Sequence, residues 1–114
     1  MKENIIVNKS IDFSILIIKI CETLYIQKQF VIANQLSRSA MAIGANIAEV
    51  QQAESKIDFI HKEKMAGKEA KETQYWLTIC KRIEHCEIPG EIINEIQQIH
   101  AIISKILVTA KRKM

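Results

Sequence analysis

The segment from Gln35 to Glu49 carries a heptad stripe that constrains the fold more than any other part of the chain. Four apolar residues of this segment, together with Val50 directly after it, recur at intervals of four, three, four and three. They are Leu36, Ala40, Ile43, Ile47 and Val50. This spacing places all of them on one face of an α-helix. Small residues surround the stripe, so other helices can approach it closely. The segment therefore predicts a helix packed among other helices.

The composition favours a chain of few, long helices. Of its 114 residues, 48% are hydrophobic, and only three are glycine and one is proline. A chain of this length is expected to form one domain, covering residues 1–114. It contains no run near the ~18 apolar residues that span a bilayer. Its first residues do not have the pattern of a signal peptide. We therefore expect a cytoplasmic protein without a membrane partner.

Periodicity and capping residues predict four helices. They span about residues 10–26, 32–52, 56–86 and 90–112. Ser10 and Ser55 are the expected N-caps of the first and third helices, and Asp58 fits a capping box with Ser55. Pro89 and Gly90 form the strongest turn signal and are expected to end the third helix. Short connections favour antiparallel neighbours. The sequence thus predicts an all-α, antiparallel up-down-up-down four-helix bundle.

The first helix offers more apolar surface than one bundle needs. One stripe consists of Phe13, Ile17, Ile20 and Leu24, and a second of Ile11, Ile15, Ile18 and Tyr25. The third helix is expected to bury Phe59, Ala66, Ala70, Thr73, Leu77 and Cys80. A helix of an isolated bundle needs an apolar arc of only about 100°. We therefore expect a homo-oligomer whose interface includes the second stripe of the first helix.

Several polar residues lie on the otherwise packed faces of the second and third helices. They are Arg38, Asn46, Glu49, Glu69 and Glu72. A buried charge without a partner costs roughly several kcal/mol. We therefore expect these residues to form a structural polar network that fixes the helix register. A catalytic site is the alternative, but no nucleophile or histidine joins them, so no catalytic residue is assigned.

Metal chemistry has little support in the sequence. A di-metal bundle needs Glu-x-x-His pairs on two helices. None of His61, His85 and His100 has a glutamate three residues before it. Cys80, His85 and Cys86 do not have the spacing of a standard zinc site. We expect no metal, no cofactor and no enzymatic activity.

The third helix carries a basic stripe. Its members are Lys64, Lys68, Lys71 and Arg82, with Tyr75 among them. Cations interleaved with an aromatic side chain are typical of surfaces that follow a phosphate backbone. A weaker candidate consists of Lys111, Arg112 and Lys113, where cations also favour the helix C-terminus. The stripe predicts non-specific binding of RNA or DNA. A solvated helix face has the same pattern, so a protein-interaction scaffold without nucleic-acid affinity is the alternative.

The motif of the second helix resembles the signature of a known family. That signature is Gln-Leu-Arg-Arg-Ala, then Ser/Ala-Ile, then Asn-Ile-Ala-Glu-Gly. The chain has Gln35-Leu36-Ser37-Arg38-Ser39, then Ala42-Ile43, then Asn46-Ile47-Ala48-Glu49-Val50. Val50 replaces the closing glycine, and the Phe-Pro pair usual before this helix is absent. The family is the four-helix-bundle family of large-subunit ribosomal RNA intervening-sequence proteins, which includes the accessory variability determinants of diversity-generating retroelements.

The resemblance implies more than the residues do by themselves. It implies a homopentamer, a ring with a central channel, without enzymatic activity. For the retroelement members it implies nucleic-acid binding and docking with a reverse transcriptase. For the intervening-sequence members it implies no settled function.

Overall fold

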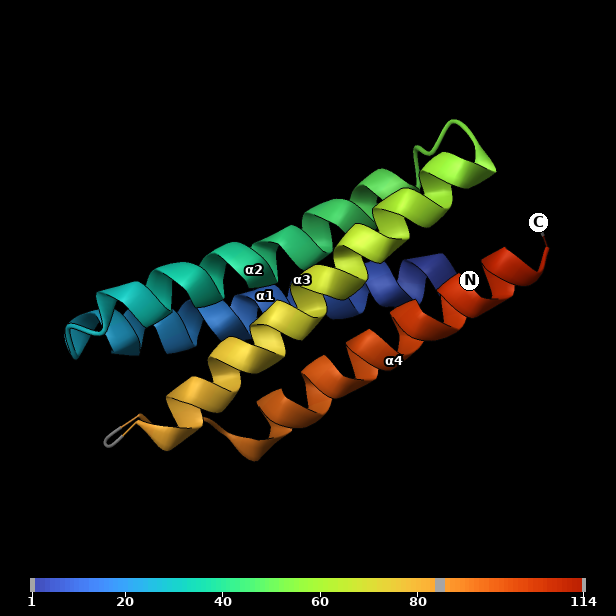
Figure 1. Ribbon diagram of the computed structural model, residues 1–114. Coiled ribbons are helices and arrows are strands. Elements are labelled where there is room, and N and C mark those ends of the chain that lie inside the picture. The colour runs from blue at the N-terminus through green and yellow to red at the C-terminus, as the bar shows by residue number, and fades with distance from the viewer. Residues whose placement is uncertain (1, 84–85, 114) are drawn as a thin grey trace.

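Four helices make up the computed structural model, which describes the backbone of residues 2–83 and 86–113 and their side chains from residue 5 onward. They are α1 (Lys2–Ile26), α2 (Phe30–Val50), α3 (Lys56–Arg82) and α4 (Gly90–Arg112). Each helix packs against the next, and α4 returns to pack against α1 (Figure 1). The described residues form no strand and no helix long and apolar enough to cross a bilayer. The predicted all-α fold with four helices is confirmed.

The heptad stripe of α2 lies at the centre of the core. All five of its residues are buried, and Leu36 and Ile43 are fully inaccessible. The other helices meet this stripe with apolar residues of their own, among them Phe13, Ile17, Leu24, Ala66, Ala70, Leu77, Ile92, Ile96, Ile99 and Ile103. Removing aliphatic surface from water contributes about 25 cal/mol per Å². Interlocking aliphatic faces are therefore the main source of stability.

The start of α1 differs from the prediction. The helix begins at Lys2, well before Ser10. Ser10 is buried, and its hydroxyl donates a hydrogen bond to the carbonyl oxygen of Val7 at 2.7 Å. A serine inside a helix can bond to the preceding turn in this way. Ile6, 2% exposed, extends the buried face into the added turns. Ser10 is therefore an interior residue of α1 and not its N-cap.

A tight turn joins α1 to α2. Lys28 has a left-handed backbone with φ 63°. The N–H of Gln29 donates to the Leu24 carbonyl at 2.8 Å, and the N–H of Lys28 donates to the Tyr25 carbonyl at 3.0 Å. These are the two hydrogen bonds of a Schellman motif, whose left-handed position is usually glycine. The turn is short, so α2 spans Phe30–Val50 in place of the expected 32–52.

The start of α3 agrees with the prediction. The Ser55 hydroxyl accepts a hydrogen bond from the N–H of Asp58 at 3.1 Å, as an N-cap does. The Asp58 carboxylate accepts from the N–H of Glu54 at 3.1 Å, one residue before the donor of a standard capping box. Both ends of this connection are therefore hydrogen-bonded locally.

The end of α3 comes earlier than expected. The helix stops at Arg82, since Ile83 has extended dihedrals, φ −80° and ψ 132°. Residues 84–85 lie outside the described part of the chain, and His85 with them. Pro89 does not end α3 but is the N-cap of α4, whose first residue is Gly90. A longer connection than predicted thus separates the two helices.

The core opens at one end of the bundle. Here the first residues of α1 and α3 lie near the last residues of α2 and α4 (Figure 1). Phe59, expected on the buried face of α3, is only partly buried because it lines a cavity of about 1120 Å³. The other residues expected on that face are buried as predicted, namely Ala66, Ala70, Thr73, Leu77 and Cys80. We call this space the end cavity.

Candidate nucleic-acid interface

The basic stripe lies on the outer face of α3. Lys64, Lys68, Lys71 and Arg82 are all exposed. Tyr75, 60% exposed, lies among them. At 3.6 residues per turn these five positions fall within a sector of about 60°. Among the described residues, none of the four cations takes part in an ion pair. The stripe therefore presents uncompensated positive charge along one side of the bundle.

Two acidic residues of α3, Glu69 and Glu72, are turned toward α2. Arg38 of α2 forms ion pairs with both, through one guanidinium nitrogen to Glu69 at 3.3 Å and the other to Glu72. The indole N–H of Trp76 also donates to the Glu72 carboxylate at 3.3 Å. About half of the Arg38 side chain is exposed, so these pairs contribute little to stability. The single positive charge of Arg38 offsets one of the two negative charges of Glu69 and Glu72.

Asn46 and Glu49 do not join these ion pairs. The amide of Asn46 donates to the Ala42 carbonyl of its own helix at 2.9 Å. Glu49 is exposed and forms no ion pair with the described residues. The five residues expected to form one network thus separate, because Asn46 bonds within its own helix. Only Arg38, Glu69 and Glu72 come together.

A buried hydroxyl pair that the sequence analysis did not single out lies beneath Arg38. The side-chain oxygens of Ser39 and Thr73 are 2.8 Å apart, and neither residue is exposed. Thr73 Oγ1 also lies 2.8 Å from the Glu69 carbonyl oxygen, to which it donates. The Thr73 hydroxyl is likewise in donor geometry to Ser39 Oγ, and the Ser39 hydroxyl donates to the Leu36 carbonyl oxygen at 3.4 Å. The pair connects α2 and α3 through the core.

His100 of α4 lies near the basic stripe, close enough for the charge of Lys71 to act on it. Burial, and then the positive charge of Lys71, lower the pKa of His100 below its usual range. His100 is therefore neutral at pH 7 and adds no charge to the surface there. On the α2 side, Arg38 offsets part of the negative charge of Glu69 and Glu72. The candidate interface consists of the α3 cations and Tyr75.

The three cysteines are buried and free. Burial raises the pKa of the Cys21 thiol to about 11. Burial, followed by a hydrogen bond and a charge interaction with Cys86, raises that of Cys80 to about 12. Cys21 and Cys80 are therefore protonated at neutral pH, the unreactive form of a thiol. The described residues include no cluster of three or more metal-ligating side chains, and His85 lies outside them.

Comparison with known proteins identifies the family. The model of the 23S rRNA-intervening sequence protein family matches residues 2–108. The chain belongs to this family. A solved structure with 40% sequence identity is similar over 94% of this chain and 98% of its own, with a TM-score of 0.87. It is a protein of unknown function from the S23 ribosomal protein family of Bacteroides thetaiotaomicron. No curated protein matches. The family recognised from the second-helix motif is confirmed.

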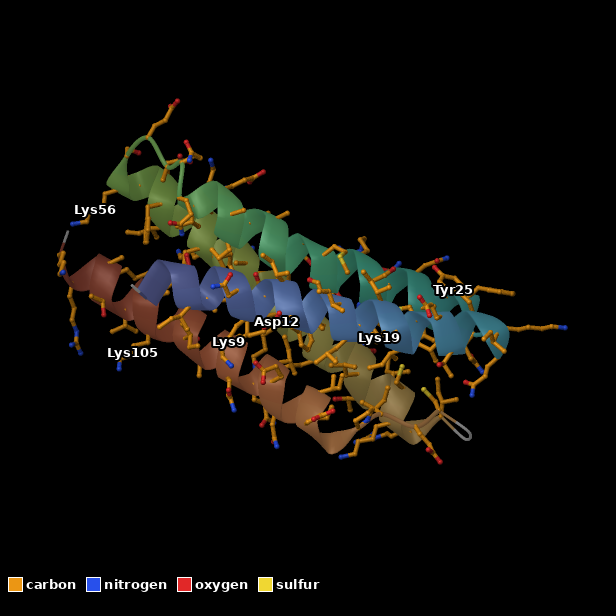
Figure 2. All side chains as sticks on the ribbon, turned by 180° about the vertical axis from the view of Figure 1, so that it is seen from behind. Lys9, Asp12, Lys19, Tyr25, Lys56 and Lys105 are labelled. Atoms are coloured by element: carbon orange, nitrogen blue, oxygen red, sulfur yellow. The ribbon has the colours of Figure 1, made fainter. Side chains whose placement is uncertain are left out.

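The chain also exposes several apolar side chains on the outer side of α1. The second stripe of α1 does face outward, and Ile11, Ile15, Ile18 and Tyr25 are between 41% and 50% exposed. Next to it, Phe30 at the start of α2 is 52% exposed, and its ring lies 6.2 Å from that of Tyr25. Tyr25 also bonds to Asn34 of α2. Figure 2 shows α1 between α2 and α4, with Tyr25 at its far end. We call these five residues the outer apolar face.

The second group of candidate cations, at the end of α4, lies apart from the α3 stripe. Lys111, Arg112 and Lys113 are exposed at the end of α4. The carbonyl oxygen of Lys113 accepts a hydrogen bond from the amine of Lys56, at the start of α3, at 3.1 Å. Of these three cations Lys113 lines the end cavity, and the group lies near the start of α3, away from Arg82.

Proposed function

We propose that the protein is a non-enzymatic scaffold that self-assembles and binds nucleic acid without sequence specificity through α3. In this proposal the chain is an antiparallel up-down-up-down bundle, and the assembly is a homopentamer, as the resemblance implies. Self-assembly covers the outer apolar face of α1 and α2. The α3 stripes then face outward and contact RNA or DNA. A reverse transcriptase is a further partner only if the chain belongs to the retroelement branch.

One observation carries the nucleic-acid proposal. The four cations of α3 have no ion-pair partner among the described residues, while Glu69 and Glu72 beside them are paired with Arg38. From Lys64 to Arg82 the stripe is about 27 Å long at 1.5 Å per residue, the length of about eight phosphates along one duplex strand. Tyr75 lies within this length and offers an aromatic ring on which a base can stack.

The expected affinity is modest. Four cations per chain make few phosphate contacts, so binding is expected to be micromolar or weaker. Because this binding is almost entirely electrostatic, its affinity should fall steeply with salt. Contacts to phosphates carry no sequence information. The net charge of +3 per chain adds a favourable long-range field, which grows with the number of chains in an assembly. An assembly should therefore bind more tightly than one chain.

The test is a titration of labelled RNA and duplex DNA at two salt concentrations. The variant Lys64→Glu/Lys68→Glu/Lys71→Glu should lose binding at low salt. A matched variant reverses three exposed lysines outside the stripe, Lys19, Lys28 and Lys105. It has the same net charge and should retain most of the affinity. Equal losses in the two variants would show that only net charge matters.

Two other outcomes would contradict this function. Binding that responds neither to salt nor to the triple reversal would remove the stripe as the contact surface. No binding at low salt would favour the alternative, a protein-interaction scaffold without nucleic-acid affinity. The non-enzymatic part has its own test, because hydrolysis of RNA abolished by a single side-chain change would overturn it.

A further inference from the structure

The end cavity has an aliphatic interior. Its volume is about 1120 Å³, which is ample for a small ligand. Its apolar walls come from all four helices, through Ile5, Val50, Phe59, Ile102, Ile106 and Ala110. Elsewhere in the bundle, side chains of this type fill the core. At this end they line open space, which favours an apolar occupant.

The rim of the end cavity is predominantly basic. Lys56, Lys105 and Lys113 contribute amines, and Glu54 contributes one carboxylate. Figure 2 labels Lys56 and Lys105 at the same end of the bundle. Among the lining residues that the structure describes, three amines against one carboxylate favour an anionic group at the rim. The cavity therefore combines an aliphatic interior with a cationic opening.

One hydrogen bond limits what can enter. The Lys56 amine donates to the Lys113 carbonyl oxygen at 3.1 Å and so bridges the start of α3 and the end of α4. At this point one lysine side chain and one hydrogen bond span the opening between the two helices. An α-helix with its side chains is about 10–12 Å across. A helix from a partner would have to break this bridge, whereas a single unbranched alkyl chain is narrow enough to pass beside it.

We infer that the end cavity binds a single-chain aliphatic carboxylate, with its alkyl chain among the isoleucines and its carboxylate at the rim lysines. The chain supplies the apolar contacts that the open end of the core lacks. The carboxylate accepts charge-assisted hydrogen bonds from Lys56 and Lys105. This site shares no residue with the α3 stripe, so its test is independent of the nucleic-acid proposal.

The test is calorimetric titration of the full chain with decanoate, below the concentration at which decanoate forms micelles. Decanol and butyrate are the matched ligands, because the first lacks the charge and the second most of the chain. Decanoate should bind at least tenfold more tightly than either. The variant Lys56→Gln/Lys105→Gln should weaken decanoate binding about tenfold. The control Lys64→Gln/Lys68→Gln loses the same charge on the outer face of α3 and should bind decanoate normally.

A second variant tests the interior. Ile106→Trp places a larger side chain in the end cavity and should abolish binding, with circular dichroism confirming the helical fold. Failure of decanoate to bind would overturn the inference, as would equal binding by the Lys56→Gln/Lys105→Gln variant and the control. Equal affinity for decanoate and decanol would overturn the role of the lysines. Tight binding of an acidic amphipathic peptide without binding of decanoate would also overturn it and would assign the cavity to a protein partner.

Discussion

The hydroxyl oxygens of Ser39 and Thr73 lie 2.8 Å apart in the core, where α2 packs against α3. Both side chains are fully buried, so neither has water as an alternative partner. Thr73→Val removes one hydroxyl and leaves that of Ser39 with only the Leu36 carbonyl at 3.4 Å. The free energy of unfolding should fall by about 1–2 kcal/mol, measured by urea denaturation.

The double variant Ser39→Ala/Thr73→Val removes both hydroxyls. It should cost less than the sum of the two single variants, because no polar group is left without a partner. Thr73→Ser retains the hydroxyl and serves as the control for its loss. Additive effects of the two single variants would show that the hydroxyls do not interact.

Ile18→Glu should lower the order of the oligomer. Ile18 lies on the outer apolar face, where an ionised carboxylate would have to be buried in an interface. Sedimentation velocity should show smaller species, while circular dichroism shows the same helix content. Thr23→Glu adds the same charge to an exposed position of α1 outside this face and should leave the assembly unchanged. If the wild-type chain is a monomer at micromolar concentration, the predicted assembly is wrong.

Lys28→Gly should stabilise the protein. Lys28 has a left-handed backbone that costs a residue with a Cβ about 1 kcal/mol, and glycine adopts it without this cost. The gain is reduced by the greater entropy of glycine in the unfolded chain. We expect a net gain of up to about 0.5 kcal/mol in thermal or urea unfolding. Lys28→Ala removes the same charge but keeps the Cβ, and it should show no such gain.

Arg38→Gln should weaken RNA binding although Arg38 lies on α2. Without the guanidinium, the carboxylates of Glu69 and Glu72 lose the one positive charge that partly offsets them on α3. At low salt the affinity should fall a few-fold, while stability changes by less than about 1 kcal/mol because the pairs are exposed. Lys19→Gln removes one positive charge from exposed α1 and is the control. Equal effects of the two substitutions would show that Arg38 has no specific role.

The buried thiols predict a loss of stability in alkaline solution. In the folded protein Cys80 keeps its proton up to a pKa of about 12, whereas the unfolded thiol releases it near the ordinary pKa of 9.0. Between these values the unfolded state binds fewer protons, so the free energy of unfolding falls as pH rises, by about 1.4 kcal/mol per pH unit for one such thiol.

Cys80→Ala should therefore lose stability less steeply than the wild type above pH 9, as measured by denaturant unfolding at a series of pH values. Thr78→Ala, a change on the exposed face of the same helix, should keep the wild-type slope. Parallel curves for the wild type and Cys80→Ala would show that this thiol does not carry the pH dependence.

The sequence predicted the helices better than their ends. The stripe of α2 was reliable because five positions repeat in register, and all of them are buried. The start of α1 was wrong because Ser10 is a capping residue type whose hydroxyl here bonds inside the helix. The early end of α3 was missed because Pro89 is a strong sequence signal for a helix end. No residue type at Ile83 marks the extended backbone found there.

In the candidate site, too, features that follow from helical spacing could be predicted, whereas features that depend on how the helices pack could not. Exposure of Lys64, Lys68 and Lys71 follows from helical spacing alone. The pairing of Arg38 with carboxylates about 30 residues away was expected only in outline, because it depends on how α2 packs against α3. The hydroxyl pair of Ser39 and Thr73 and the end cavity have no sequence pattern of their own, since both arise from the relative placement of helices.

The return of α4 to α1 makes the helices neighbours in a closed cycle, in which every helix has two flanks covered. The cross-section accordingly has no open edge on which a further copy could continue the same packing, as it can in a solenoid. The start of α1 and the end of α4 lie at the same end of the bundle (Figure 1). Joining them with a linker, and placing new termini between α3 and α4, would give a circular permutant in which each helix keeps the same neighbours.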